Sequence, residues 1–165
     1  MKKINKMDTC NKVKRYLAAA LLALIFSLSG LTSTYSNESF RISVLQIRSG
    51  ENQHTFQIEV AETPNQRAQG LQWRKRMAPD QGMLFDFKQT FPVTMWMKNT
   101  YLSLDMFFIA ENGTIINIAR DTKPQSLKHI NSAGPARGVL EVLAGTAQRL
   151  GIKAGDKVIH PAFVN

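Results

Sequence analysis

The sequence predicts a mainly β protein, a compact sandwich-like or barrel-like single domain with two short helices. Apolar residues repeatedly alternate with polar ones over short runs, which is the period of a β-strand. Turn residues such as Gly and Asn separate these runs, and two segments carry the signals of a helix end. With 44% hydrophobic and 20% charged residues, the 165-residue chain has the composition of a folded globular protein.

The first expected elements are a hairpin and a helix. Alternating residues predict one strand over 40–47, with a shift of phase inside it, and a second over 54–60. Residues 49–52 contain a glycine and predict the turn between them. Thr63 followed by Pro64 then predicts the start of a short helix, because threonine caps a helix and proline fits its first position.

The second half of the domain is expected to hold mostly strands. They are predicted over residues 83–87, 93–98, 102–109, 114–119, 138–143 and 157–160. Asn112-Gly113 between two apolar runs predicts a hairpin turn. Residues 121–137 are rich in Pro, Ser, Asn and Gly and predict a loop. A second short helix is expected near 146–150, closed by Gly151.

The N-terminal segment is typical of an export signal. Six basic side chains precede the uncharged run 17–28, which is followed by small residues and is shorter than the roughly twenty residues that cross a bilayer. We therefore expect a signal peptide over 1–30, a flexible spacer over 31–39 and a single β-rich domain over 40–165. The protein is expected to be exported, periplasmic or extracellular, and to meet a membrane only through its leader before cleavage.

The net charge and the small numbers of cysteine and histidine residues exclude several classes of function. The chain carries 21 basic and 12 acidic residues, but residues 1–34 hold six basic and one acidic, so 15 against 11 remain, or +4. Nucleic acid is therefore not an expected partner. Cys10, the single cysteine, lies in the leader. Because His54, His129 and His160 are far apart in the sequence, we expect no metal site, and no motif indicates a cofactor.

A set of motifs runs through nearly all of residues 42–163. They are Gly70-Leu71, Gly82-Met83-Leu84-Phe85, Trp96-Met97-Lys98-Asn99-Thr100, Leu104-Asp105, Gly113, Pro135, Val139-Leu140-Glu141, Gly145 and Gly151-Ile152-Lys153-Ala154-Gly155-Asp156. Together they resemble the family called domain of unknown function 192. The resemblance implies a small, mainly β, sandwich-like domain, often behind an export signal, with no agreed biochemical activity. One position departs from the pattern, because Gln72 stands where that family commonly has methionine.

The stretch 93–100 is the most informative candidate for a site. Strand alternation puts Met95 and Met97 on one face and Trp96 and Lys98 on the other. The two methionines raise a minor hypothesis of copper(I) binding, since thioether sulfur suits soft metals. Packing is the favoured interpretation of the pair, because methionine commonly fills a core.

Asp105 follows this stretch inside an apolar strand. A buried carboxylate needs partners, and Lys98 and Asn99 are the nearest polar candidates, with Arg67 or Arg74 as the alternatives that folding could bring near. Either the group makes a structural pair, or it belongs to a pocket. Residues 74–76 are three consecutive cations, which are typical of a solvated surface, with attraction to anionic lipid or polysaccharide as the alternative.

The predicted function is an exported, non-enzymatic binding module. Trp96, Lys98, Asn99 and Asp105 would bind a small polar or anionic ligand, a polysaccharide or a cell-envelope partner. The alternative is a hydrolase that uses Asp105 as acid or base, with Lys98 or Asn99 stabilising developing charge. No catalytic residue can be assigned from the pattern, because the histidines, serines and carboxylates form no recognisable catalytic spacing.

Overall fold

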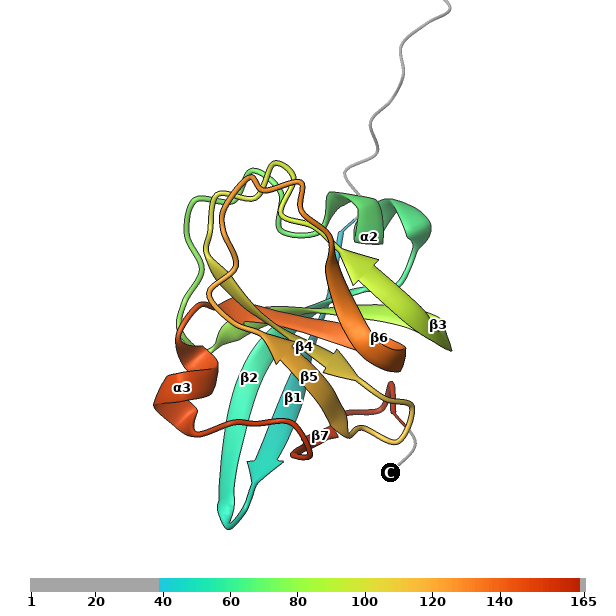
Figure 1. The fold of residues 1–165 in the computed structure, drawn as a ribbon, viewed down its shortest axis with the longest axis vertical. Coiled ribbons are helices and arrows are strands. Elements are labelled where there is room, and N and C mark those ends of the chain that lie inside the picture. The colour runs from blue at the N-terminus through green and yellow to red at the C-terminus, as the bar shows by residue number, and fades with distance from the viewer. Residues whose placement is uncertain (1–38, 164–165) are drawn as a thin grey trace, which may run out of the picture. The chain divides into compact units, whose positions relative to one another are not determined.

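The computed structural model describes residues 39–163, and within this range the chain forms one seven-stranded sheet (Figure 1). The strands are β1 (Arg41–Ser49), β2 (Asn52–Ala61), β3 (Gln81–Met95), β4 (Leu104–Ile109), β5 (Ile115–Ala119), β6 (Ile130–Leu143) and β7 (Lys157–Ile159). The helices are α2 (Pro64–Gln69) and α3 (Thr146–Leu150). The prediction of a mainly β, barrel-like domain with two short helices is confirmed. The predicted signal peptide, and the spacer up to residue 38, lie outside the described residues.

The sheet has the order β5-β4-β6-β3-β2-β1-β7 and curls into a half-barrel. Its pairs are antiparallel except β2 with β3, which α2 connects as a parallel crossover. The curl brings the two edges of the sheet together, where Thr114 forms an isolated bridge with Lys157. There the N–H of Val158 donates to the carbonyl of Gly113 at 2.8 Å, so the edge backbone groups have partners.

Local signals place the hairpin and the helices where the sequence predicts them. The β1–β2 turn has two residues, and Gly50 in it adopts a φ of +59°, which favours glycine. At α2, the side chain of Thr63 accepts from the Gln66 N–H while the Gln66 side chain accepts from the Thr63 N–H. This capping box satisfies N–H groups at the helix start that have no partner within the helix. Among the described residues, no helix is long and apolar enough to cross a membrane.

Two predicted boundaries are wrong. The strands expected over 83–87 and 93–98 form one bent strand, β3, in which Lys88 has a φ of +61°. The loop expected over 121–137 ends at residue 129, because β6 continues to pair with β3 beyond the core. Pro135 lies opposite Pro92 beside a register shift, a place where a strand tolerates proline.

The sheet separates two apolar cores. The inner core, inside the curl, contains Leu45, Ile47, Phe56, Ile58, Val60, Leu84, Phe107, Ile109, Ile115, Leu140, Val142, Ala147, Ile152, Val158 and Phe163. The outer core, on the other face, contains Ala61, Leu71, Met83, Phe85, Val93, Met97, Leu104, Met106, Phe108, Ala136 and Val139. All six residues of β4 are buried because both of its faces are covered.

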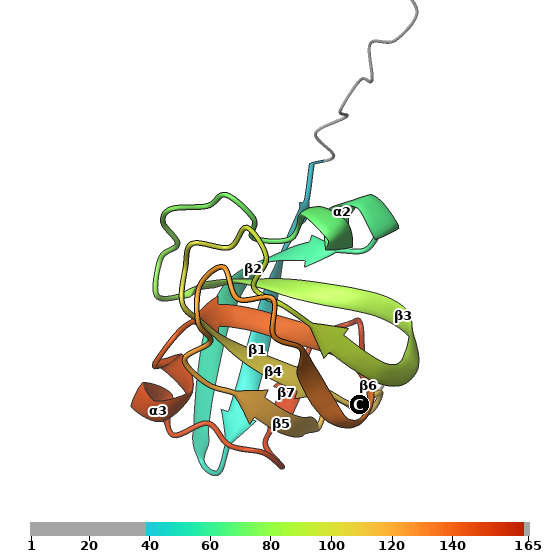
Figure 2. The same cartoon turned by 45° about the horizontal axis from the view of Figure 1, so that its top comes forward.

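Loops cover part of the outer core. They are residues 70–80, 96–103 and 120–129, and we call them the three-loop end. In Figure 2 they lie side by side as the green, yellow and orange loops at the upper left. The N–H of Trp73 donates to the carbonyl of Asn99 at 2.8 Å, which joins the first loop to the second. The candidate site residues of the sequence lie where the second loop meets the sheet.

Candidate functional site

The stretch 93–100 alternates between core and surface as predicted. Val93 and Met97 are buried in the outer core, while Trp96 and Lys98 are exposed. The side chain of Trp96 keeps 49% of its surface accessible. Lys98 Nζ lies 5.3 Å from the centroid of the Trp96 ring, so the cation rests on the aromatic face. The two side chains form one surface unit with a flat apolar part and a charged part.

Asn99 joins two loops beside this unit. It has a φ of +57°, a conformation that asparagine adopts more readily than most residues. Its Nδ2 donates to Gln72 Oε1 at 3.1 Å, and Gln72 Nε2 in turn donates to the carbonyl of Ala68 at 2.7 Å. Asn99 therefore positions the loop that carries Trp96. Gln72, the departure from the resembled pattern, supplies this contact.

Asp105 is fully buried and satisfied by backbone donors. Its Oδ1 accepts from the N–H of Asp121 at 2.9 Å, and its Oδ2 accepts from the N–H of Ala147 at 2.8 Å. Ala147 is the second residue of α3, where N–H groups have no partner within the helix. The expectation that Lys98 or Asn99 neutralises this carboxylate is therefore wrong, because its hydrogen bonds come from the 120–129 loop and a helix start.

The register of β4 and β6 separates Asp105 from a second buried carboxyl, Glu141. Asp105 pairs with Val142, and Met106 pairs with Glu141. Directly paired residues share a face, and successive residues alternate, so the two acids point to opposite faces of the sheet. Asp105 points toward the inner core and α3, with Val142. Glu141 points toward the outer core, the face on which Met106 packs.

Glu141 has no hydrogen bond or ion pair among the described residues, although it is only 4% exposed. Burial raises the pKa of Glu141 from its ordinary 4.5 to about 8. The group is therefore mostly a neutral carboxylic acid at pH 7, able both to donate and to accept a hydrogen bond. The sequence reasoning did not single out this residue. The available signal was the same as for Asp105, an acidic residue inside an apolar strand.

Glu141 opens onto a small hollow between α2, β3 and the 96–103 loop. Gly70 and Leu71 line it from the end of α2, Trp96 and Lys98 line it from the loop, and Glu141 lines it from β6. The space measures about 40 Å³, which holds a water molecule or a small group of a larger ligand. The hollow brings Trp96 and Lys98 to Glu141 rather than to Asp105.

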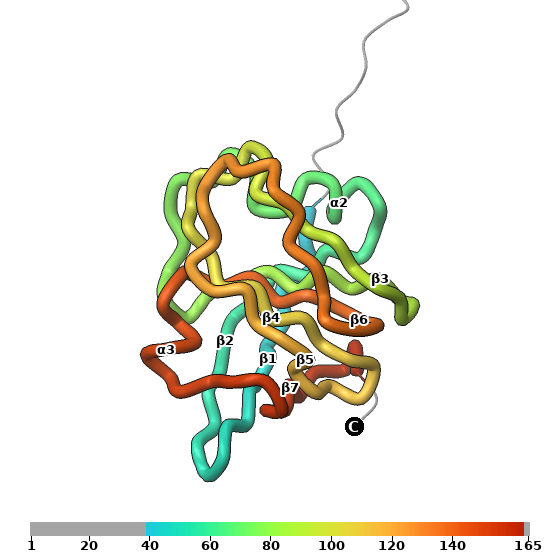
Figure 3. Tube along the Cα trace, viewed as in Figure 1, coloured from blue at the N-terminus to red at the C-terminus, as the bar shows by residue number. Residues whose placement is uncertain are grey.

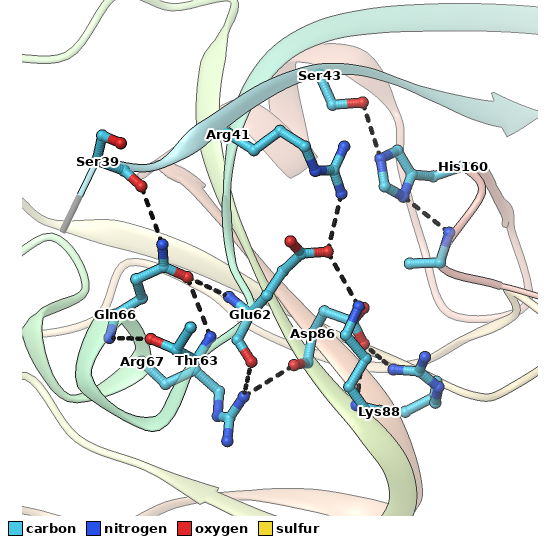
Figure 4. A network of polar contacts seen from close by, with 12 residues as sticks. Ser39, Arg41, Ser43, Glu62, Thr63, Gln66, Arg67, Asp86, Lys88 and His160 are labelled. Carbon is cyan, nitrogen blue, oxygen red and sulfur yellow. Dashed lines mark hydrogen bonds and ion pairs between the residues drawn. The ribbon is translucent and has the colours of Figure 1, made fainter.

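A polar network lies near the start of β1 (Figure 4), and its acids are paired. Glu62 Oε1 accepts from Arg41 Nη2 and from Lys88 Nζ, each at 3.0 Å. These hydrogen bonds lower the pKa of Glu62 from 4.5 to about 2, the Arg41 bond most of all. Asp86 is buried and pairs with Lys88 at 2.6 Å and with Arg137. The network ties strands together and leaves no acid free for a ligand.

The two methionines of the copper hypothesis belong to the outer core. Met97 is fully buried, and its Sδ accepts a hydrogen bond from Thr122 Oγ1 at 3.2 Å. Met95 is partly buried and packs against the same core. Packing thus accounts for the pair. Among residues 39–163, no three His, Cys, Asp or Glu side chains gather as a metal site would require.

Comparisons with known proteins agree on family and fold. The chain matches the family DUF192, described as "Uncharacterized ACR", over residues 45–160. It is 45% identical to a protein of known structure from Sinorhizobium meliloti described as a "putative transcription regulator", covering 78% of this chain and 100% of the other, with a TM-score of 0.75. A protein of unknown function from Novosphingobium aromaticivorans is 32% identical, covering 80% and 94%, with a TM-score of 0.73. No curated protein matches the chain.

Proposed function

The chain belongs to this family of uncharacterised proteins, and from that premise we propose that it is an exported, non-enzymatic binding module for an acidic saccharide. One small group of the ligand would enter the hollow at Glu141, and the rest of the ligand would lie over Trp96 and Lys98 at its mouth. The proposal keeps three of the four residues that the sequence indicates, with Asn99 as a positioning residue for the loop. It replaces Asp105 by Glu141.

The unpartnered carboxyl of Glu141 is the observation that carries the proposal. The other buried carboxyls described above, Asp105 and Asp86, have partners within the protein. Glu141 has none, and its oxygens stay accessible at the hollow, because the buried side-chain atom without a hydrogen bond in the described part of the chain is His54 Nε2. A ligand bound at Glu141 would supply the hydrogen bonds that this carboxyl group does not make within residues 39–163. A neutral carboxylic acid suits a hydroxyl group well, because each can both donate and accept.

Trp96 and Lys98 indicate the rest of the ligand. An exposed indole ring offers a flat apolar surface on which a sugar ring stacks. The Lys98 ammonium, which lies over one face of that ring, attracts a negative group. A sugar that carries hydroxyls and one carboxylate, such as a uronic acid, satisfies all three side chains together.

Calorimetric titration of the protein with glucuronate, and with glucose for comparison, tests the proposal. We expect glucuronate to bind more tightly than glucose, and both Trp96→Ala and Glu141→Leu, which removes the polar atoms of the side chain, to weaken glucuronate binding at least tenfold. Trp73→Ala is the matched control, since it removes an exposed tryptophan from the neighbouring loop, outside the hollow. Equal glucuronate affinity in Trp96→Ala and Trp73→Ala would contradict the proposal.

The hydrolase alternative has weaker support. Asp105, its proposed acid or base, has both oxygens engaged by backbone N–H groups and is 0% exposed. Most glycoside hydrolases use a pair of carboxyl groups on either side of the scissile bond. Among the described residues that line the hollow, Glu141 is the single acidic one. The geometry therefore favours binding over cleavage.

A further inference from the structure

Exposed apolar side chains gather on the three-loop end. Seven large apolar residues are exposed in the described part of the chain, and four of them lie on these loops: Trp73, Trp96, Tyr101 and Leu127. Trp73 and Leu127 keep 60% and 65% of their surface accessible. Trp73 and Tyr101 contact edge to face, with ring centroids 5.9 Å apart. Such a concentration on one end of a domain indicates an interaction surface.

Backbone hydrogen bonds hold the loops together as one surface. The N–H of Met97 donates to the carbonyl of Ser126 at 3.0 Å, and the N–H of Gln125 donates to the carbonyl of Thr100 at 3.1 Å. With the bond from Trp73 to Asn99, these contacts join all three loops, whose tips run side by side at the top of Figure 3. The aromatic groups are therefore presented by a fixed scaffold.

The same loops carry a strong excess of positive charge. Their basic residues are Arg74, Lys75, Arg76, Lys98, Arg120, Lys123 and Lys128, against the acidic residues Asp80 and Asp121. Arg74 is neutralised by Glu59. Lys75, Arg76, Lys123 and Lys128 are exposed and make no ion pair within residues 39–163. Free cations thus surround the exposed aromatic and leucine side chains.

We propose that the three-loop end docks on an anionic phospholipid surface. Tryptophan and tyrosine favour the interface between lipid and water, where the ring is buried and the polar group stays hydrated. Lysine and arginine near that interface are attracted to anionic headgroups. The positive charge of the three-loop end complements the negative charge of such headgroups. The exposed side chain of Leu127 adds an apolar group that enters between the headgroups. The docking surface shares Trp96 and Lys98 with the saccharide hollow. It also depends on Trp73, Lys75 and Leu127, which do not line the hollow.

Tryptophan fluorescence of the full chain tests the docking directly. The chain has two tryptophans, Trp73 and Trp96, and both lie on the three-loop end. Their emission therefore reports on this end. We expect vesicles of brominated phosphatidylglycerol to quench the emission and shift it to shorter wavelength. Vesicles of brominated phosphatidylcholine should leave it nearly unchanged, and added salt should weaken the effect.

Charge variants identify the surface. Each cation near an anionic membrane contributes a factor of about five in partitioning, so Lys75→Gln with Arg76→Gln should lower the partition constant for phosphatidylglycerol vesicles, measured by quenching titration, about twenty-five-fold. Arg48→Gln with Arg149→Gln is the matched control, because it removes two exposed cations outside the three loops. An equal effect of the two double variants would overturn the proposal, as would equal quenching by neutral and anionic vesicles.

Two further readouts separate the possible occupants. If polygalacturonate changes the tryptophan emission while phosphatidylglycerol vesicles do not, the surface takes a polysaccharide and the lipid proposal is wrong. Glu141→Leu should keep vesicle quenching while losing glucuronate binding. The two proposals can therefore fail independently.

Discussion

Replacing Glu141 by glutamine tests whether burial holds this carboxyl neutral in the hollow. The side chain has nearly the same shape as the neutral acid but does not ionise between pH 4 and 9. In the wild-type protein, the pKa of Glu141 is about 8 when folded, against 4.5 as its ordinary value. Between these two pH values the folded state holds a proton that the unfolded state has lost. The free energy of unfolding contributed by this group therefore falls as pH rises.

The size of the effect follows from the two pKa values. Each pH unit between 4.5 and about 8 lowers the stability by about 1.4 kcal/mol, so the full loss is about 5 kcal/mol. Below pH 4.5 both states are protonated and Glu141→Gln should be close to the wild type in stability. At pH 8 and above, the variant should be more stable than the wild type by several kcal/mol.

Urea unfolding of both proteins at intervals from pH 4 to pH 9 measures this difference. Other titrating groups contribute equally to both proteins, so the difference between the two free energies isolates Glu141. The reasoning would be refuted by curves that stay parallel across the whole range. It would also be refuted if the wild type gained stability on the variant as pH rises, because that result requires a carboxylate stabilised by a partner.

Two other substitutions test the acids that do have partners. Asp105→Asn should lower the free energy of unfolding by about 2 kcal/mol or more, because an amide offers one acceptor oxygen to the two backbone N–H groups at Asp121 and Ala147. Urea unfolding measures this loss. Unchanged glucuronate affinity in the folded variant distinguishes a structural role of Asp105 from a binding role. Glu62→Gln should make the free energy of unfolding fall less steeply in acid. The pKa of Glu62 is lowered to about 2, so its stabilising contribution is lost as pH falls from 4.5 toward 2. Free energies of unfolding of the two proteins that differ by the same amount at every pH from 2 to 5 would contradict this.

Much of the fold could be predicted because its signals are local. The two-residue turn at Gly50, the cap at Thr63 and the helix end at Gly151 each depend on neighbours in the sequence. The parallel pairing of β2 with β3 and the continuation of β6 to residue 130 depend on distant partners. A Pro-, Gly- and Ser-containing segment becomes a strand because β3 lies beside it, and no local pattern contains that information.

The sequence predicts Trp96 and Lys98 of the candidate site, but it does not predict Glu141 on the opposite side of the hollow. Strand alternation in one segment placed Trp96 and Lys98 together on the surface. The partner across the hollow comes from β6, more than forty residues later, and pairing of β6 with β4 and β3 brings it there. Asp105 lies closer to Lys98 in the sequence, so the sequence predicts Asp105 as that partner. That prediction is wrong, because the register of β4 places the Asp105 side chain on the inner face of the sheet.

The contrast between the two buried acids explains why one holds the fold and the other suits a ligand. On the inner face, the start of α3 lies over β4 and offers N–H groups without helical partners, so Asp105 is satisfied as a carboxylate. On the outer face, α2 ends beside Glu141 instead of starting there, and a helix end presents carbonyl groups rather than N–H donors. Burial raises the pKa of Glu141 to about 8, so this acid is mostly protonated at neutral pH, and it makes no hydrogen bond within residues 39–163. The start of α3 thus supplies a donor to Asp105, whereas Glu141 has no donor among the described residues and is the group on which the proposed saccharide site depends.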